Sequence, residues 1–272
     1  MLLRRKGRGA WLFLMLALAV PASEAAALRV CSDPNNLPFS NRALEGFENK
    51  IAALLAHDLG ETLEYTFAAQ RKTFAERTLN AHRCDLIMGV PVGMPGMIQT
   101  SPYYRSAYVF VYRVDHDLRI HSLRDPRLRQ FKIGVHLIGD DDLPPVIALG
   151  GQGIVDNVSG FMIYGDYAKP NPPARLLEAV ADNSIDVAVV WGPLAGFFAR
   201  RSTVPLRVVA IDDAPSFAPL RFQYAIAMGV RRGDVALRGR LDRVIEHERG
   251  AILAILRNYG VPLFGPGAVP HE

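Results

Sequence analysis

The sequence predicts an α/β protein of two lobes, each a mainly parallel sheet flanked by helices, with a cleft between the lobes. Strands alternate with helices along the 272 residues, and the alternation restarts near residue 131. A hydrophobic content of 50% with 21% charged residues is ample for a core and excludes disorder. Only two cysteines among 23 glycines and 19 prolines exclude disulfide-dense and collagen-like scaffolds.

The first half shows the strand–helix succession typical of a parallel sheet. Apolar residues recur at helical spacing between Gly46 and Gly60, which mark the start and the end of one helix. The run 85–90 is apolar enough to be buried on both faces of a sheet. The expected elements are strand 28–31, helix 47–59, strand 63–67, helix 72–82, strand 85–90 and strand 107–112.

The second half repeats the pattern after a charged stretch, residues 113–129. We expect lobe 1 at 28–113 with 222–272 and lobe 2 at 114–221, linked by the strands 107–112 and 222–230. Ligands bind beyond the carboxyl ends of strands in open α/β sheets, so two facing lobes would form one cleft. The expected elements are strand 131–136, helix 146–150, strand 158–164, helix 173–183, strands 186–191, 206–211 and 222–230, and one or two helices over 235–259.

Residues 1–27 have the order of a signal peptide. A cationic start at residues 4–8 precedes the apolar run 11–20 and three alanines, 25–27. The apolar run is shorter than the roughly 20 residues that span a bilayer, although an uncleaved anchor is an alternative. We therefore expect Sec-type export to the periplasm and a mature chain from Leu28 without a transmembrane segment.

The net charge of +4 belongs largely to that N-terminal segment. Four of the 31 basic and one of the 27 acidic residues lie in it, which leaves 27 and 26, a balance of +1. The mature chain therefore gives no reason to expect an anionic partner. No run of Lys or Arg interleaves with aromatic residues after residue 27, so nucleic-acid binding is not expected.

The two cysteines, Cys31 and Cys84, lie 53 residues apart. In an oxidising compartment an even pair favours a disulfide, with two buried thiols as the alternative. No C-x-x-C motif suggests redox chemistry.

Several segments resemble type II periplasmic solute-binding proteins. They are Arg29–Phe39, Gly46–Glu48, Cys84–Gly89, Ser101–Tyr104 and Asp186–Gly196. The resemblance covers Leu28 to Phe264 and implies the two-lobed fold stated above.

The sequence also resembles a narrower group, the solute-binding-protein-like accessory proteins of quinoprotein dehydrogenases. This resemblance implies a non-catalytic periplasmic helper of a pyrroloquinoline-quinone (PQQ)-dependent methanol or alcohol dehydrogenase. The dehydrogenase would be the partner, with its c-type cytochrome as a second candidate; PQQ would belong to that enzyme, and no cofactor is expected on this chain. The segments that carry it are Cys31–Asn41, Arg83–Asp85, Met88–Pro91, Tyr103–Ser106, Tyr164–Tyr167, Pro170–Arg175 and Val190–Pro193.

The charged anchors of amino-acid receptors with this fold are missing. Residues 90–100 contain no Lys or Arg to hold a ligand carboxylate, and Trp191 stands where those receptors place an aspartate. Unpaired ligand charges would cost several kcal/mol in a buried site, so an α-amino acid ligand is not expected.

Apolar and aromatic residues take the place of those anchors, and such a surface suits a peptide or a protein segment. Met88, in mid-strand, is expected in the core, whereas core and cleft are both open for Trp191 at a strand end. For His136 the alternative to a cleft position is a structural role. For Asp140–Asp142 the alternative is a solvated loop, and the segment lacks the spacing of a calcium site. The predicted cleft residues are Asp33, Asn35, Asn36, Phe39, Phe47, Met94, Met97, Tyr103, Tyr104, His136, Asp141 and Trp191.

Catalytic and metal motifs are absent from the sequence. It contains no G-x-S-x-G elbow, P-loop, G-x-G-x-x-G or H-E-x-x-H, and Glu246–Glu248 is expected on a solvated helix face. No metal site and no enzyme activity are therefore expected. The competing interpretation is a binding protein that delivers a small non-amino-acid solute to an ABC importer.

Overall fold

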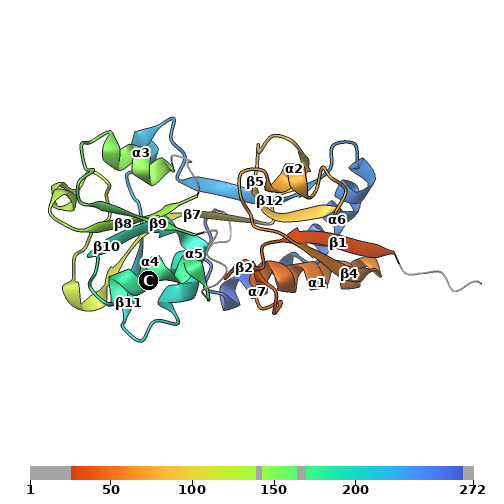
Figure 1. Cartoon of the computed structure of the whole chain (residues 1–272), viewed down its shortest axis with the longest axis horizontal. Coiled ribbons are helices and arrows are strands. Elements are labelled where there is room, and N and C mark those ends of the chain that lie inside the picture. Colours follow the sequence, from red (N-terminus) through yellow and green to blue (C-terminus); the bar gives the residue numbers. More distant parts are fainter. Residues whose placement is uncertain (1–25, 139–142, 164–169, 266–272) are drawn as a thin grey trace, which may run out of the picture.

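A computed structural model describes residues 26–138, 143–163 and 170–265. One curled sheet runs through both lobes in the order β4-β1-β5-β12-β7-β10-β8-β9, with β6 paired to β12 and β11 to β7. Figure 1 shows the two lobes side by side, with helices on both sides of the sheet. The predicted two-lobed α/β fold is confirmed.

Lobe 1 is built on three parallel strands, β4, β1 and β5, next to the antiparallel strand β12. Its helix α1 begins after the cap Gly46 and ends at Gly60 (φ 67°), as the sequence predicts. The elements of lobe 1 are β1 (Ala27–Ser32), β2 (Asn35–Asn36), β3 (Ser40–Asn41), α1 (Phe47–Leu59), β4 (Thr62–Phe67), α2 (Phe74–Arg77), β5 (Leu86–Pro91), β6 (Ile98–Gln99), β12 (Gln223–Val230), α6 (Val235–His247) and α7 (Arg249–Asn258).

Lobe 2 has its own parallel set, β10, β8 and β9, with β11 antiparallel on β7. Its buried strands β8 and β10 match the two apolar runs that the sequence predicts. The elements are η1 (Val114–His116), η2 (Pro126–Arg129), β8 (Ile133–Leu137), α3 (Pro144–Gly150), β9 (Val158–Met162), η3 (Pro172–Ala174), α4 (Arg175–Ala181), β10 (Val187–Trp191), α5 (Gly192–Ala199), β11 (Leu206–Ala210) and η4 (Ala214–Phe217), where η marks a 3₁₀ helix.

Two strands pass between the lobes. The first part of β7 (Tyr104–Arg113) pairs with β12, and the remainder of β7 pairs with β10 and β11. Phe222, directly before β12, belongs to the core of lobe 2, and Val230, the last residue of β12, belongs to the core of lobe 1. Both strands therefore belong to both lobes, which makes the sheet continuous.

The segment that follows α7 makes a third connection. Ser106 Oγ in β7 donates a hydrogen bond to the Pro262 carbonyl (2.7 Å), and the Phe264 amide donates to the Arg105 carbonyl (3.1 Å). The Phe264 side chain packs against the core of lobe 2. The chain therefore returns from α7 in lobe 1 to the second lobe.

Three local predictions differ from the structure. The helix expected over 72–82 is reduced to the four residues of α2, and helix α5, which directly follows β10, was not predicted. The charged stretch 113–129 folds into η1 and η2, where neighbouring side chains pair locally. Those pairs are Arg113–Asp115, Arg119–Asp117 and Arg127–Asp125.

The Cys31–Cys84 disulfide is present, with a Cα–Cα distance of 5.6 Å, so that prediction is confirmed. It joins β1 to the segment that precedes β5, and both cysteines are buried. The bond cross-links neighbouring parts of the lobe 1 sheet.

The expected signal peptide lies largely outside the described residues, which begin at residue 26. Ala27, the residue after which cleavage is expected, is the first residue of β1 and pairs with Thr62 of β4. No helix within the described ranges is long and apolar enough to span a membrane.

Candidate functional site: a neutral aromatic cavity between the lobes

A cavity of about 320 Å³ lies between the lobes. Lobe 1 contributes residues from β2, α1 and β5, and lobe 2 contributes residues from β8, β10 and the start of α3. The cavity therefore sits where the carboxyl ends of strands in the two lobes approach each other. The described lining residues are Asn36, Phe39, Glu48, Gln70, Gly89, Pro91, Tyr104, Tyr108, His136, Ile138, Leu143, Pro144, Ile163, Trp191, Leu194, Tyr224 and Ile226.

Aromatic rings dominate the wall. Trp191 is the last residue of β10 and the cap of α5, and its ring contacts Tyr108 and Tyr224 edge-on, with centroids 5.4 and 5.9 Å away. Trp191 packs against the cores of both lobes. Tyr108 and Tyr224 therefore hold the Trp191 ring in place along the wall.

The loop after β1 and the start of α1 fix the lobe 1 side of the cavity. The amides of Phe47 and Glu48, unpaired within a helix first turn, donate to the carbonyls of Pro38 and Phe39 (2.8 and 2.9 Å). Gly46 is needed there, because a Cβ on it would lie 2.0 Å from the Phe39 carbonyl oxygen. These contacts place Phe39 and Glu48 together at the cavity.

Glu48 has only 8% of its surface exposed, and its carboxyl forms no hydrogen bond or ion pair with the described residues. Gly89 makes room for it, since a Cβ there would lie 2.2 Å from Glu48 Oε1. Burial raises the pKa of this carboxyl from 4.5 to about 8. At neutral pH the group is therefore mainly protonated, and it both donates and accepts hydrogen bonds.

His136, near the carboxyl end of β8, is 2% exposed. Neither ring nitrogen has a hydrogen-bond partner among the described residues. Burial lowers the pKa of the imidazole to about 3, and the carbonyl of Pro173, which acts in the opposite direction, does not offset it. His136 is therefore neutral and offers one N–H donor and one nitrogen acceptor.

The described lining of the cavity carries no formal charge at neutral pH. Its described residues include no Lys, Arg or Asp, and its two groups that could be charged near that pH, Glu48 and His136, are held neutral. Burial also raises the pKa of Tyr104 well above its ordinary value. A ligand with charged groups would find no counter-charge among these described residues, in keeping with the missing anchors in the sequence.

Five of the predicted cleft residues line this cavity: Asn36, Phe39, Tyr104, His136 and Trp191. Phe47 lies behind them, fully buried, with its ring edge-on to Phe39 and Tyr104 at 5.3 and 6.1 Å. Tyr103 is also buried, with its ring 4.9 Å from that of Tyr104. Both support the wall from the core of lobe 1.

Asp33 and Asn35 shape the surrounding loops. The Asp33 carboxylate accepts hydrogen bonds from the amides of Asn35 and Gln70, both at 2.8 Å. Asn35 Oδ1 accepts from the Asn171 amide in lobe 2 (3.2 Å), so this residue joins the lobes.

The two predicted methionines lie elsewhere. Met94 is 44% exposed in the turn after β5, because the chain leaves the sheet there. Met97 packs into the core beside the disulfide, over Gly229, whose missing Cβ leaves room for its sulfur. Met88 is 2% exposed in the core of lobe 1, and Asp141 lies outside the described residues.

Sequence reasoning missed Glu48, Tyr108 and Tyr224. Glu48 follows Gly46-Phe47 and was considered only as part of a helix start, where an acidic residue is common. Its position directly after the loop of the first strand, beside predicted cleft residues, is the signal that could have identified it.

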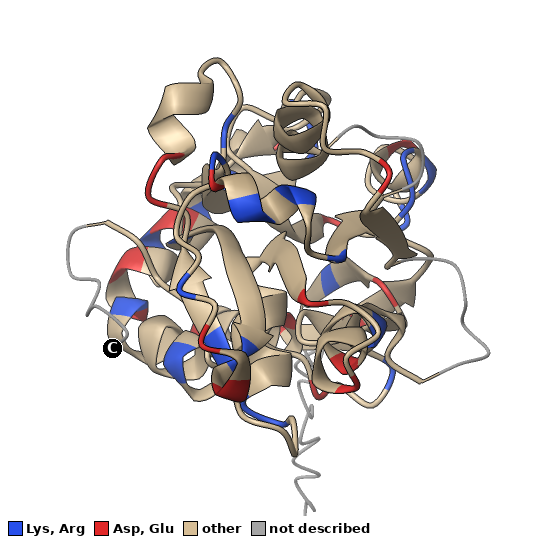
Figure 2. Cartoon of the chain, turned by 90° about the vertical axis from the view of Figure 1, so that its left-hand side faces the viewer, with Lys and Arg blue, Asp and Glu red and all other residues tan. Residues whose placement is uncertain are grey.

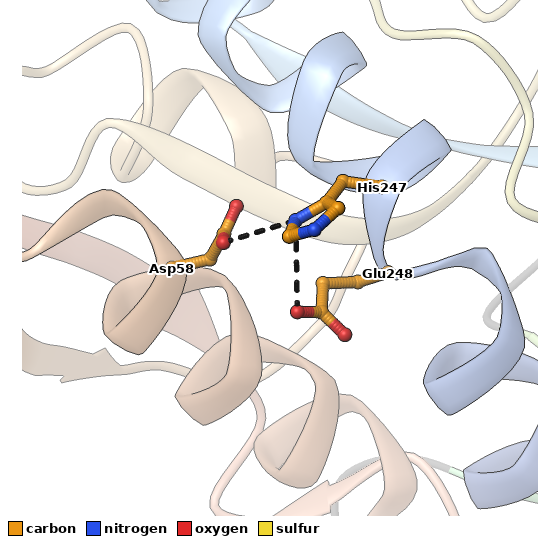
Figure 3. A group of neighbouring side chains, drawn as sticks. All are labelled: Asp58, His247 and Glu248. Carbon is orange, nitrogen blue, oxygen red and sulfur yellow. Dashed lines mark hydrogen bonds and ion pairs between the residues drawn. The ribbon is translucent and has the colours of Figure 1, made fainter.

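A second group of polar side chains lies outside this lining, where the ends of α1 and α6 meet (Figure 3). His247 Nδ1 is 3.2 Å from Asp58 Oδ1 and 3.8 Å from Glu248 Oε1. The His247 side chain is 72% exposed, in keeping with the solvated face expected there. Elsewhere the charges are mixed: Figure 2, which faces the lobe 2 end, shows acidic and basic residues interspersed.

No protein-family model matches the sequence. A curated relative, MoxJ of Methylorubrum extorquens AM1, is 30% identical over 251 residues, which cover 88% of this chain and 82% of that protein. The crystal structure of the periplasmic binding protein XoxJ of Methylobacterium extorquens AM1 is 35% identical and superposes with a TM-score of 0.73, over 88% of this chain and 99% of that one. MxaJ of Methlophaga aminisulfidivorans MPT is 25% identical, with a TM-score of 0.74 over 87% and 100%.

Proposed function

The chain belongs to the MoxJ/MxaJ/XoxJ family of periplasmic binding proteins associated with methanol oxidation, and from this premise we propose that it is a non-catalytic accessory protein of a PQQ-dependent methanol or alcohol dehydrogenase. In this proposal a cleavable Sec-type signal peptide delivers it to the periplasm. It docks on the dehydrogenase, or helps to mature or activate it, through the cavity between lobes 28–113 with 222–272 and 114–221.

The observation that carries the docking proposal is the neutral aromatic cavity centred on Trp191. Exposed apolar side chains lie close in sequence to the lining on both lobes: Val92 and Met94 after β5, Ile147 in α3 and Met162 in β9. Each lies within three residues of a cavity-lining residue, namely Pro91, Pro144 or Ile163. Exposed apolar residues around an apolar hollow are typical of protein-docking sites.

The connection between α5 and the end of α7 also supports docking over solute delivery. Solute-binding proteins of importers close by hinge motion between their lobes. Here Arg200 Nη1 of lobe 2 donates to the Arg257 carbonyl of lobe 1 (2.9 Å), and Phe197 stacks on Tyr259. These contacts oppose a large opening of the lobes.

A second candidate function is delivery of a small uncharged solute to an ABC importer. The size of the cavity supports it, since small-molecule sites occupy about 300–1,000 Å³.

Deletion of the gene, followed by assay of dye-linked methanol dehydrogenase in the periplasmic fraction, tests the proposal. We expect holoenzyme activity to fall; normal activity together with lost uptake of a solute would support the importer function instead. In titrations with the purified dehydrogenase, Trp191→Ala should weaken binding at least tenfold. Val235→Ala, an exposed apolar side chain at the start of α6, is the matched control and should bind like wild type.

A further inference from the structure

We propose that the cavity between the lobes binds an uncharged aromatic ring that carries a hydroxyl group, which is the chemistry of a phenol. The inference rests on the proposed function for the use of the cavity, and it adds the class of group that fills it. That group is either a tyrosine side chain of the partner or a free phenol.

Charge excludes most other occupants. Because the described lining holds no cation and keeps Glu48 and His136 neutral, a carboxylate or an ammonium group would be buried without a partner. Burying an unpaired charge costs far more than burying a neutral ring.

The aromatic wall selects a ring. Five aromatic side chains line the cavity, and two of them, Tyr108 and Tyr224, contact the Trp191 ring edge-on. Aromatic pairs in edge-to-face or offset-stacked geometry are stabilised beyond what the area they bury contributes. A planar guest can contact several of these rings without moving them.

The two unpartnered polar groups select a hydroxyl. Glu48 comes from lobe 1 and His136 from lobe 2. Both ring nitrogens of His136 are buried without a hydrogen-bond partner among the described residues, and burial is the one influence on the pKa of the Glu48 carboxyl. A plain hydrocarbon would leave both groups without a partner, at the full desolvation penalty of each. A hydroxyl both donates and accepts, so it can pair with either group.

Calorimetric titration with p-cresol, the isolated side chain of tyrosine, tests the inference. We expect p-cresol to bind at least tenfold more tightly than toluene, which lacks the hydroxyl, and 4-hydroxybenzoate, a carboxylate, to show no binding. Trp191 is the only tryptophan outside residues 1–27, so its fluorescence reports directly on the cavity. Equal affinity for toluene, or tight binding of 4-hydroxybenzoate, would overturn the inference.

Two variants of one residue provide the matched comparison. Glu48→Gln keeps a neutral donor and acceptor and should retain the preference for p-cresol over toluene. Glu48→Leu removes both the donor and the acceptor. The double variant Glu48→Leu/His136→Leu should reduce the preference for p-cresol over toluene at least fivefold. If the variants with leucine do not fold, loss of selectivity in Glu48→Gln would contradict the assignment by itself.

Competition separates the two sources of the phenol and keeps this inference distinct from the proposed function. If p-cresol displaces the dehydrogenase, the natural occupant is a tyrosine of the partner. If p-cresol binds and the dehydrogenase is unaffected, the occupant is a free phenol. Dehydrogenase binding without any p-cresol binding would overturn the inference and leave the accessory function standing.

Discussion

Phe197 of α5 stacks on Tyr259 at the end of α7, with ring centroids 5.7 Å apart and planes inclined by 11°. Phe197 belongs to lobe 2 and Tyr259 to lobe 1, so the stack joins the lobes outside the cavity lining. The Arg201 guanidinium lies 3.6 Å from the centre of the Phe197 ring. The backbones also approach closely: a Cβ on Gly196 would lie 1.8 Å from the Gly260 carbonyl oxygen. This contact fixes the relative position of the lobes.

Gly196→Ala should separate α5 from α7, because the added methyl meets backbone that cannot rotate away. We expect the free energy of unfolding, measured in urea, to fall by about 3 kcal/mol, and small-angle scattering to show a larger radius of gyration. Gly239→Ala in α6 is the control, since its Cβ would meet only the Arg243 side chain at 3.9 Å. That variant should gain up to about 1 kcal/mol from helix propensity. A Gly196→Ala protein as stable as wild type would contradict the role given to this contact.

Removal of the disulfide should destabilise the protein strongly. The bond closes a loop of 53 residues, for which loop entropy gives about 4 kcal/mol. We expect the free energy of unfolding of Cys31→Ala/Cys84→Ala, measured in urea, to be lower than that of wild type by about that amount, with a correspondingly lower midpoint. Dithiothreitol should shift wild type toward the double variant and leave the double variant unchanged. A wild-type midpoint insensitive to the reductant would show that the bond contributes nothing.

The sequence predicts most strands and the longest helices because their signals are local. Buried runs such as Asp186–Trp191 and the helical spacing that begins at Phe47 depend only on nearby residues. Helix α5 was missed since residues 192–197 are all buried, so no polar face gives it a helical period. The charged stretch 113–129 gave no signal because its pairs join residues two apart in turns.

The site was only partly predictable, because burial depends on the packing of distant segments. Trp191 reaches the cavity through its position at a strand end, which the sequence indicates. Met94 and Met97 lie three residues apart, yet one is exposed and the other buried, since the turn between them is built on Gly96 with a φ of 92°. Glu48 becomes a cavity group only because Gly89, 41 positions later in the sequence, makes room for it.

Asp58, His247 and Glu248 should behave as surface charges and not as a zinc site. Structural zinc takes four ligands, whereas the described residues bring together only three, and the His247 side chain is 72% exposed. We expect His247→Gln to change the free energy of unfolding by less than about 1 kcal/mol. Equimolar Zn²⁺ should leave the melting temperature of wild type and variant unchanged. A rise of several degrees in wild type alone would identify a metal site.

The buried pair of neutral groups should give the protein an unusual dependence of stability on pH. Below pH 4.5 the Glu48 carboxyl is protonated in both the folded and the unfolded state. Between pH 4.5 and its folded pKa of about 8 it is ionised only in the unfolded state, so the free energy of unfolding falls as pH rises. At about 1.4 kcal/mol per pH unit the total loss reaches at most roughly 5 kcal/mol. Tyr103 and Tyr104, which interact electrostatically with Glu48, stay neutral because burial raises their pKa.

His136 acts in the opposite direction, because its pKa is lowered from 6.5 to about 3. As pH falls below 6.5 the unfolded state binds a proton that the folded state does not bind, so the free energy of unfolding decreases toward acidic pH. Between pH 4.5 and 6.5 the two contributions cancel, which predicts a plateau with a decline on either side. Glu48→Gln should remove the alkaline decline: its free energy of unfolding should exceed that of wild type at pH 8 by several kcal/mol and equal it at pH 4. As a control, Glu76→Gln, which replaces an exposed carboxylate in α2, should match wild type at both pH values. A Glu48→Gln protein that still loses stability between pH 6.5 and 8 would show that Glu48 is not the group responsible.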